Sequence, residues 1–239
     1  MLLGTQAIVL HSIKYGDSSL IVKMFTRQKG IVSFMVKGVR GRKKGSRTAL
    51  LEPLSLVCVE MQIKDNRDLQ LAKEIRADYP YKTIYASTGK VAQVLFIAEV
   101  LVKTIKEEEQ NDALFDFLSA SLKFLDEAAF EIPDFHLKFL LEYALHLGVY
   151  PVGNYTLKTP WLRLSDGIFL DKPDTHCIDI PSSTAIAALM NTEFDDLGTL
   201  GFNRHQRQLL TDHLLTYFRW HFPSVKDLKT PAVLKELFE

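Results

Sequence analysis

The first 77 residues alternate short apolar runs with polar turns, a pattern typical of β-strands. The apolar runs are rich in Val, Ile, Leu and Phe, and the turns between them contain Gly, Asp, Asn and Ser. The strands are predicted at residues 6–10, 20–25, 31–37, 54–63 and 69–75. Five short strands at this spacing indicate a small closed barrel, because closure leaves no exposed strand edge.

The apolar period changes after residue 81. From Val91 to Ile105, apolar residues recur at three- and four-residue spacing, which is one face of a helix. Further helices are predicted at 111–125, at 133–148, from about 182, at 203–221 and at 231–238. The sequence therefore predicts an α+β protein. It has a barrel domain at 1–80 and an all-helical domain at 81–239, with an irregular insertion at about 149–181 that Gly and Pro interrupt.

The charge is unevenly distributed, although the chain of 239 residues has 29 basic and 29 acidic side chains. Residues 1–80 contain 14 Lys and Arg but only 7 Asp and Glu, a net charge of +7, and the remainder is −7. Such asymmetry indicates that the first part meets a polyanion or a membrane surface.

The positive charge is concentrated between Asp17 and Glu52, which enclose nine Lys and Arg and no acidic residue. Its densest part, residues 37–47, reads as a glycine-interrupted loop between two predicted strands. Cations grouped in this way favour a polyanion, because binding releases the counterions condensed on its phosphates. A solvated, flexible turn is the alternative interpretation.

Seven of these nine cations and two aromatic residues form the predicted nucleic-acid site. Phosphate contacts of this kind carry affinity rather than sequence preference. Phe25 and Phe34 are candidate stacking partners from the flanking strands. For both aromatics a core position is the favoured alternative, because apolar strand positions usually face inward. The basic candidates are Lys29, Lys37, Arg40, Arg42, Lys43, Lys44 and Arg47.

Signatures of catalysis and metal binding are missing from the sequence. It has no Gly-x-Ser-x-Gly elbow, no phosphate-binding Gly-x-x-x-x-Gly-Lys motif and no His-Glu-x-x-His. His176 and Cys177 supply at most two metal ligands, so a surface loop is favoured there over a metal site. We predict a protein that is not an enzyme and that needs no cofactor.

The cysteine content and the hydropathy favour the cytoplasm. Cys58 and Cys177 are too few for a disulfide framework, which indicates a reducing compartment. The N-terminus lacks the positive region of a signal peptide, and the most apolar run, residues 94–102, is much shorter than a membrane span. We therefore predict a cytoplasmic protein with no membrane partner.

Several short motifs occur in a fixed order along the chain. The N-terminal ones are Ala-Ile-Val-Leu at 7–10, Tyr-Gly-Asp-Ser at 15–18, Phe-Thr-Arg-Gln-Lys-Gly at 25–30 and Lys-Gly-Val-Arg at 37–40. The C-terminal ones are residues 214–221 and 228–234. In combination and spacing this set resembles the RecO family of bacterial recombination-mediator proteins over nearly the whole chain.

The resemblance implies an N-terminal OB-fold followed by a helical domain. It also implies a DNA repair and recombination function without a chemical step: binding single- and double-stranded DNA and annealing complementary strands. The implied partners are RecR, the acidic C-terminal tail of the single-stranded-DNA-binding protein, and RecA, which the family helps to load. Lys37 and Arg40 match the family's DNA-contact positions, whereas the other cations are proposed on charge alone.

One departure from the family concerns metal. Many members carry a four-cysteine zinc motif after the Leu-Gly that ends the third helix, which is 147–148 here, but this chain has no cysteine until Cys177. We therefore predict that zinc is absent and that apolar residues pack the insertion instead. They are Trp161, Leu162, Leu164, Ile168 and Phe169.

Two other functions remain open at this point. The protein could be an adaptor whose helical domain captures the tail of a partner in a helix groove, with DNA contact secondary. It could also be an RNA-binding OB protein, because RNA offers the same phosphate electrostatics.

Overall fold

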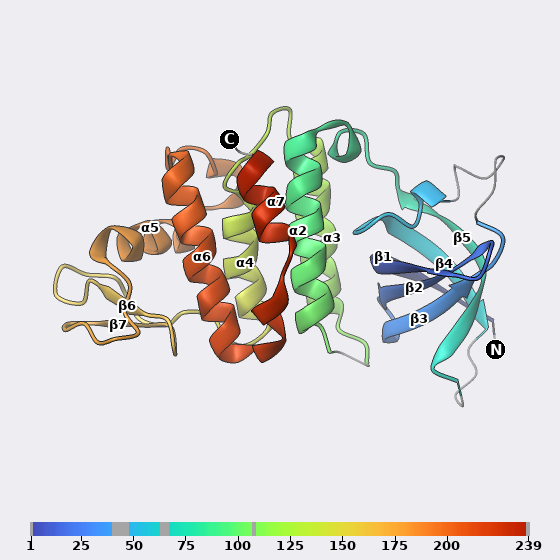
Figure 1. Cartoon of the computed structure of the whole chain (residues 1–239), viewed down its shortest axis with the longest axis horizontal. Helices are drawn as coiled ribbons and strands as arrows, with labels where there is room; N and C mark the ends of the chain where they lie inside the picture. The colour runs from blue at the N-terminus through green and yellow to red at the C-terminus, as the bar shows by residue number, and fades with distance from the viewer. Residues whose placement is uncertain (1, 40–47, 63–66, 107–108, 238–239) are drawn as a thin grey trace. The chain divides into compact units, whose positions relative to one another are not determined.

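The computed structural model describes residues 2–39, 48–62, 67–106 and 109–237. The chain forms two compact units, Met1–Glu127 (unit 1) and Ala128–Glu239 (unit 2), which are labelled element by element in Figure 1. Among the described residues, no helix combines the length and the apolar character that crossing a membrane requires.

Unit 1 begins with a closed barrel (Figure 1). Around it the strands follow the order β1-β2-β3-β5-β4, and β1 pairs with both β2 and β4. All neighbouring strands are antiparallel except β3 and β5, which are parallel. This is the topology of an OB-fold, so the predicted barrel is confirmed. The strands are β1 (Leu2–Tyr15), β2 (Ser19–Thr26), β3 (Gly30–Val36), β4 (Leu56–Gln62) and β5 (Leu69–Tyr79).

Strand β1 is much longer than the predicted 6–10. Its first half pairs with β4 from Leu2 to Ile8, and its second half pairs with β2 as far as Tyr15. The pairing with β2 begins at Ala7 and has a register shift between Val9 and His11. The prediction stopped short because polar side chains follow Leu10, where the strand continues along the exposed surface.

The barrel core follows the two-residue period of the strands. On β2, Leu20, Val22 and Met24 face inward and are buried, whereas Ile21 and Lys23 lie outside and are half-buried. The same alternation places inward side chains of the other strands in one cluster. Its further members include Ala7, Val9, Phe34, Val36, Val57, Val59 and Met61.

The parallel seam between β3 and β5 is short. Ser33–Met35 pair with Leu69–Leu71, whereas β2 pairs with β3 over the whole length from Leu20 to Thr26. Within the described part of the chain, Gly30–Val32 therefore have a strand partner on the β2 side but not on the β5 side.

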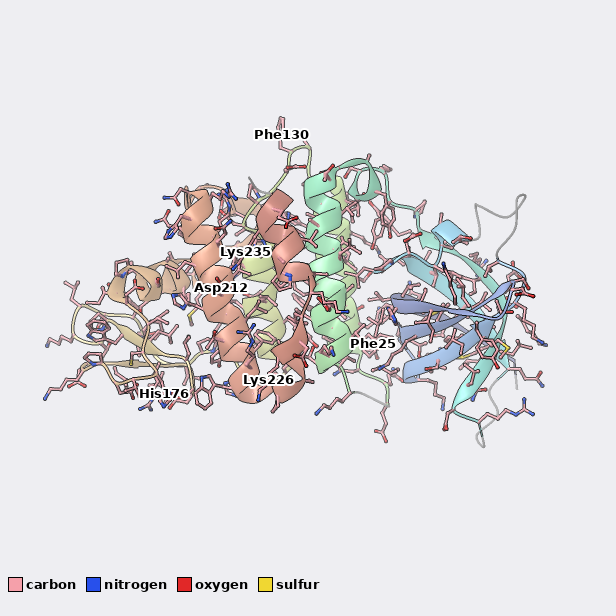
Figure 2. All side chains as sticks on the ribbon, viewed as in Figure 1. Phe25, Phe130, His176, Asp212, Lys226 and Lys235 are labelled. Atoms are coloured by element: carbon pink, nitrogen blue, oxygen red, sulfur yellow. The ribbon has the colours of Figure 1, made fainter. Side chains whose placement is uncertain are left out.

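Unit 1 continues with the 3-10 helix η1 (Ile84–Ala86), α2 (Thr88–Thr104) and α3 (Asp112–Glu127). Phe25 lies on the side of the barrel that faces α3 (Figure 2), with its ring centroid 6.0 Å from that of Phe115. Arg27 forms ion pairs with Asp112 and Asp116 of the same helix. These contacts join α3 to the barrel. A domain boundary at residue 80 remains a prediction, since the division into compact units falls after Glu127.

Asp126, near the end of α3, holds the chain that leaves β5. Its carboxylate accepts backbone N–H groups of Lys82, Thr83 and Ile84 at 2.8–3.0 Å. The side-chain ammonium of Lys90 donates to the Thr83 hydroxyl at 2.7 Å. One buried carboxylate thus satisfies three consecutive donors of an irregular segment.

Unit 2 is helical, as predicted, around a stack of aromatic side chains. The rings of Phe139 and Tyr143 lie 6.0 Å apart, and Phe218 lies 6.2 Å from Tyr143. Residues 149–181, predicted as irregular, contain a two-stranded sheet of β6 (Trp161–Arg163) and β7 (Ile168–Leu170), whose strands are too short to show a period. The remaining elements are α4 (Phe135–His146), α5 (Ile180–Met190), η2 (Phe194–Asp196), α6 (Arg204–His221), η3 (Pro223–Asp227) and α7 (Thr230–Leu237).

Candidate nucleic-acid interface

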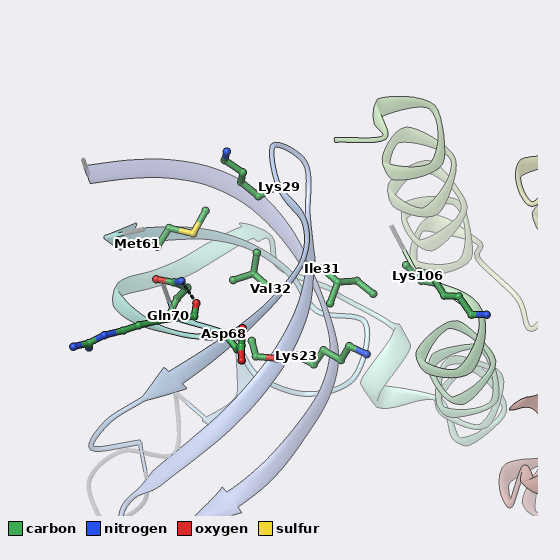
Figure 3. A pocket seen from close by; sticks show the side chains of 11 residues that line it. Lys23, Lys29, Ile31, Val32, Met61, Asp68, Gln70 and Lys106 are labelled. Carbon is green, nitrogen blue, oxygen red and sulfur yellow. Dashed lines mark hydrogen bonds between the residues drawn. The ribbon is translucent and has the colours of Figure 1, made fainter. Parts of the chain in front are cut away.

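A cavity of about 800 Å³ opens where β3 and β5 are unpaired (Figure 3). Ile31 and Val32 of β3 are half-buried in its wall, and Met61 of β4 lies buried beneath them. The polar lining is mainly cationic and comes from β2, the β2–β3 turn, β3, the start of β5 with the two residues before it, and the segment just after α2. It consists of Lys23, Lys29, Ser33, Arg67, Asp68, Gln70 and Lys106.

Two further cavities continue along the barrel. One of about 310 Å³ shares Arg67 and Gln70 with the first cavity and adds Met35, Lys37 and Leu71. A third cavity, of about 360 Å³, shares Lys37 and Leu71 with the cavity of about 310 Å³ and extends along β5 to Ile75. We call these three adjoining cavities the barrel groove.

The barrel groove has an excess of positive charge. Six cations line it against two carboxylates, so the part of the chain that the structure describes gives the groove a local charge of about +4. The cations are Lys23, Lys29, Lys37, Arg67, Lys73 and Lys106, and the carboxylates are Asp68 and Glu74. A low-dielectric wall beside such a charge attracts anionic ligands.

Strand register explains why apolar side chains lie between these cations. Ile21 is opposite Met35, and Met35 is opposite Leu71, so that one cross-strand row runs over three strands. Leu71 is 44% exposed. The neighbouring row contains Lys23, opposite Ser33. The outer face thus alternates apolar contacts with ammonium groups, a combination that suits bases and phosphates of a nucleic acid.

The predicted site residues fall into three groups. Lys29 and Lys37 are exposed and line the barrel groove. Phe25 and Phe34 are fully buried, Phe34 in the barrel core and Phe25 against Phe115, so both occupy the core position that the sequence favoured over stacking. The rest lie outside the described residues: Arg40, Arg42, Lys43, Lys44 and Arg47.

Sequence reasoning missed four cations of the groove, namely Lys23, Arg67, Lys73 and Lys106. The alternation along β2 was a usable signal for Lys23, because its neighbours Val22 and Met24 are buried. Arg67 and Lys106 carry no such signal, since only the fold brings the segments just before β5 and just after α2 beside β3.

The insertion of unit 2 is closed by ion pairs around Arg163. Its guanidinium contacts Asp166 at 2.5 Å and Asp174 at 3.1 Å. The hydrogen bond from Arg163 lowers the pKa of Asp166, and the backbone N–H of His176 together with Arg163 lowers the pKa of Asp174. Of the residues predicted to pack the insertion, Leu162, Leu164 and Phe169 are buried, and Trp161 and Ile168 are half-buried.

The potential metal ligands of the insertion are not arranged as a zinc site. Within the described ranges, no three His, Cys, Asp or Glu side chains are grouped so that they could hold a metal ion. Cys177 lies 3.5 Å from an Asp174 oxygen, but that carboxylate already faces a guanidinium. Asp166 and Asp174 are thus both paired with the Arg163 guanidinium.

We expect the insertion to be stable without metal and sensitive to Arg163. Arg163→Gln should lower the Tm of the full chain by a few degrees, because two carboxylates lose their partner, whereas a chelator should not change it. Differential scanning calorimetry with and without chelator checks this, with Lys158→Gln, an exposed change in the same insertion, as the matched control. Stoichiometric zinc in the purified protein, or a Tm that falls on chelation, would contradict the prediction.

The fold and the groove define the class of OB-barrel proteins with a helical extension. The family model described as recombination protein O matches at its N-terminal part over residues 1–80 and at its C-terminal part over residues 88–229. The chain belongs to the RecO family.

Relatives of similar length support this family assignment. The chain is 33% identical over 241 residues to a protein of Christiangramia forsetii and 34% identical over 239 residues to one of Flavobacterium psychrophilum. It is 34% identical over 242 residues to a protein of Bacteroides fragilis. Each comparison covers 100% of both chains, and each relative is named DNA repair protein RecO.

Proposed function

We propose that this protein acts in DNA repair and recombination by binding single- and double-stranded DNA in the barrel groove. The observation that carries this proposal is that six cations line the barrel groove and that apolar side chains lie between them. The names of the relatives support DNA as the polyanion. Lys and Arg hold phosphates without transferring protons at neutral pH, so the groove suits binding rather than a chemical step.

Annealing of complementary strands follows from the same chemistry. Two strands repel each other through their phosphates, and a groove with a local charge of about +4 neutralises part of that charge while the bases pair. Phosphate contacts made by Lys and Arg do not read the base sequence, so annealing should be general.

The partners are proposed from family membership. RecR, the acidic tail of the single-stranded-DNA-binding protein, and indirectly RecA are the expected partners in loading recombinase on covered DNA. A protein with these partners works in the cytoplasm, where bacterial DNA lies.

The salt dependence of DNA binding tests the proposed function. If about four to six phosphates are neutralised, log K for single strands should fall with log salt at a slope of roughly −3 to −4. Fluorescence anisotropy on labelled oligonucleotides of several base compositions measures the slope and the sequence preference together. An affinity that hardly changes with salt would rule out binding through the cationic groove.

A further inference from the structure

The first cavity of the barrel groove reaches the barrel core at the end of the groove where β3 and β5 are unpaired. Val32 packs against the core cluster, and Met61, which lies beneath it, is a fully buried member of that cluster. Access is possible because Gly30–Val32 lie beyond the three residue pairs that join β3 to β5. We call this opening the β3–β5 gap.

The gap is layered by polarity. Its floor is apolar, with Val32 and Met61, whereas Ile31 points to the other side of β3 (Figure 3) and Ile105, just after α2, adds a further apolar lining residue. The lysines lie at the mouth, where Figure 3 shows the Lys23, Lys29 and Lys106 side chains pointing away from the apolar floor. A phosphate would lose hydration on such a floor without gaining hydrogen bonds, whereas the face of a nucleobase loses little.

Hydrogen-bonding groups occur between the two layers. The Ser33 hydroxyl and the Gln70 side-chain amide line the gap, and the Gln70 amide nitrogen donates to the Arg67 carbonyl, which orients it (Figure 3). Polar groups at this depth can meet the edge of a base whose face contacts Val32. The cavity of about 800 Å³ is within the size range of small-ligand sites.

We propose that the β3–β5 gap accepts one unpaired nucleobase of a DNA single strand, while Lys23, Lys29 and Lys106 hold the phosphates on either side. This inference rests on the proposed function and deepens it, because it assigns single strands to the gap and leaves duplexes to the rest of the barrel groove. A paired base would first have to leave its stack, which costs free energy that an unpaired base does not lose.

A peptide strand added to β3 is the competing occupant of the gap. The edge at Gly30–Val32, which has no β5 partner among the described residues, fits it poorly, because it is three residues long and Ser33 is already paired with Leu69. Strands usually have five or six residues, so a three-residue edge offers few backbone hydrogen bonds.

The Val32→Phe variant tests the proposal by filling the gap with an apolar ring. We expect its affinity for single strands to fall roughly tenfold, the size of a lost base contact, while its affinity for duplex and its salt slope remain unchanged. Ile13→Phe, which enlarges an exposed apolar side chain of β1 outside the three cavities, is the matched control and should keep the ratio of single-strand to duplex affinity.

A second measurement uses the unaltered protein, in case Val32→Phe does not fold. A single strand of abasic nucleotides keeps its phosphates but has no bases, so it should bind roughly tenfold more weakly at the same salt slope. Equal affinity for abasic and normal strands would overturn the proposal, as would a folded Val32→Phe variant with an unchanged affinity ratio. A missing salt slope would instead overturn the proposed function itself.

Discussion

Replacing Lys23, Lys37 and Arg67 together by Glu is expected to weaken DNA binding about 100-fold at low salt and to flatten its salt dependence. These three cations lie in adjoining parts of the barrel groove, and reversing them changes its local charge from about +4 to about −2. In the described part of the chain, none of the three side chains pairs with a carboxylate, so the fold should tolerate the changes.

A matched control separates the position of the charges from their number. Replacing Lys158, Lys172 and Lys226 of unit 2 by Glu changes the net charge of the protein by the same amount, but these residues are outside the barrel groove. Anisotropy titrations of both triple variants should show a large loss for the groove variant only. Similar losses in both would mean that overall charge, and not the groove, sets the affinity.

A third variant compares the groove with the basic loop predicted from sequence. Arg42, Lys43 and Lys44 replaced by Glu should weaken binding without changing base preference if that loop also contacts phosphates. If this variant alone loses binding, the site lies in the loop and the barrel groove is not the DNA site.

The largest effect on stability is expected at Asp126. Asp126→Ala should lower the free energy of unfolding by roughly 2–4 kcal/mol, because the backbone N–H groups of Lys82, Thr83 and Ile84 lose their common acceptor. Asp126→Asn keeps one acceptor oxygen and should lose less. Urea unfolding followed by circular dichroism measures both. Asp171→Ala, which removes an exposed carboxylate of unit 2, should change stability by less than about 0.5 kcal/mol.

The same carboxylate should make the protein sensitive to acid. Burial raises the pKa of Asp126, but the N–H groups that it accepts outweigh burial, and its net pKa is below the ordinary 3.8. A carboxyl whose pKa is lowered on folding contributes stability above its unfolded pKa and loses it as pH falls through the folded pKa. The difference in stability between the protein and Asp126→Asn should therefore be constant above about pH 4 and shrink below it.

The barrel could be predicted because the pattern that defines each strand lies within a short stretch of sequence. Each strand alternates inward and outward residues, so Val22 and Met24 could be assigned to the core and the basic segment to the surface. The short parallel seam could not be predicted, because the register of Ser33 with Leu69 depends on strands separated by the whole of β4. The gap beside Val32 was missed for that reason.

Counting charges along the sequence overestimated the number of cations that the basic segment offers to a ligand, for a related reason. Arg27 belongs to it by sequence, but its guanidinium pairs with Asp112 and Asp116 and lies 4.8 Å above the Phe115 ring, on a helix 85 residues further along the chain. No local pattern shows that this cation is engaged. Lys106 shows the converse, since a lysine from the distant segment just after α2 joins the groove.

If DNA binds in the groove as proposed, the path of the groove along one strand sets the length of DNA that is covered. Lys29 and Lys37, which lie at opposite parts of the groove, are eight residues apart along β3, and an extended chain of that length spans about 26 Å. OB-folds cover about 4–16 nucleotides, and a path this short corresponds to the lower part of that range. On the proposed function, so small a footprint would let the protein occupy a brief exposed stretch of DNA that is too short for a partner with a longer site.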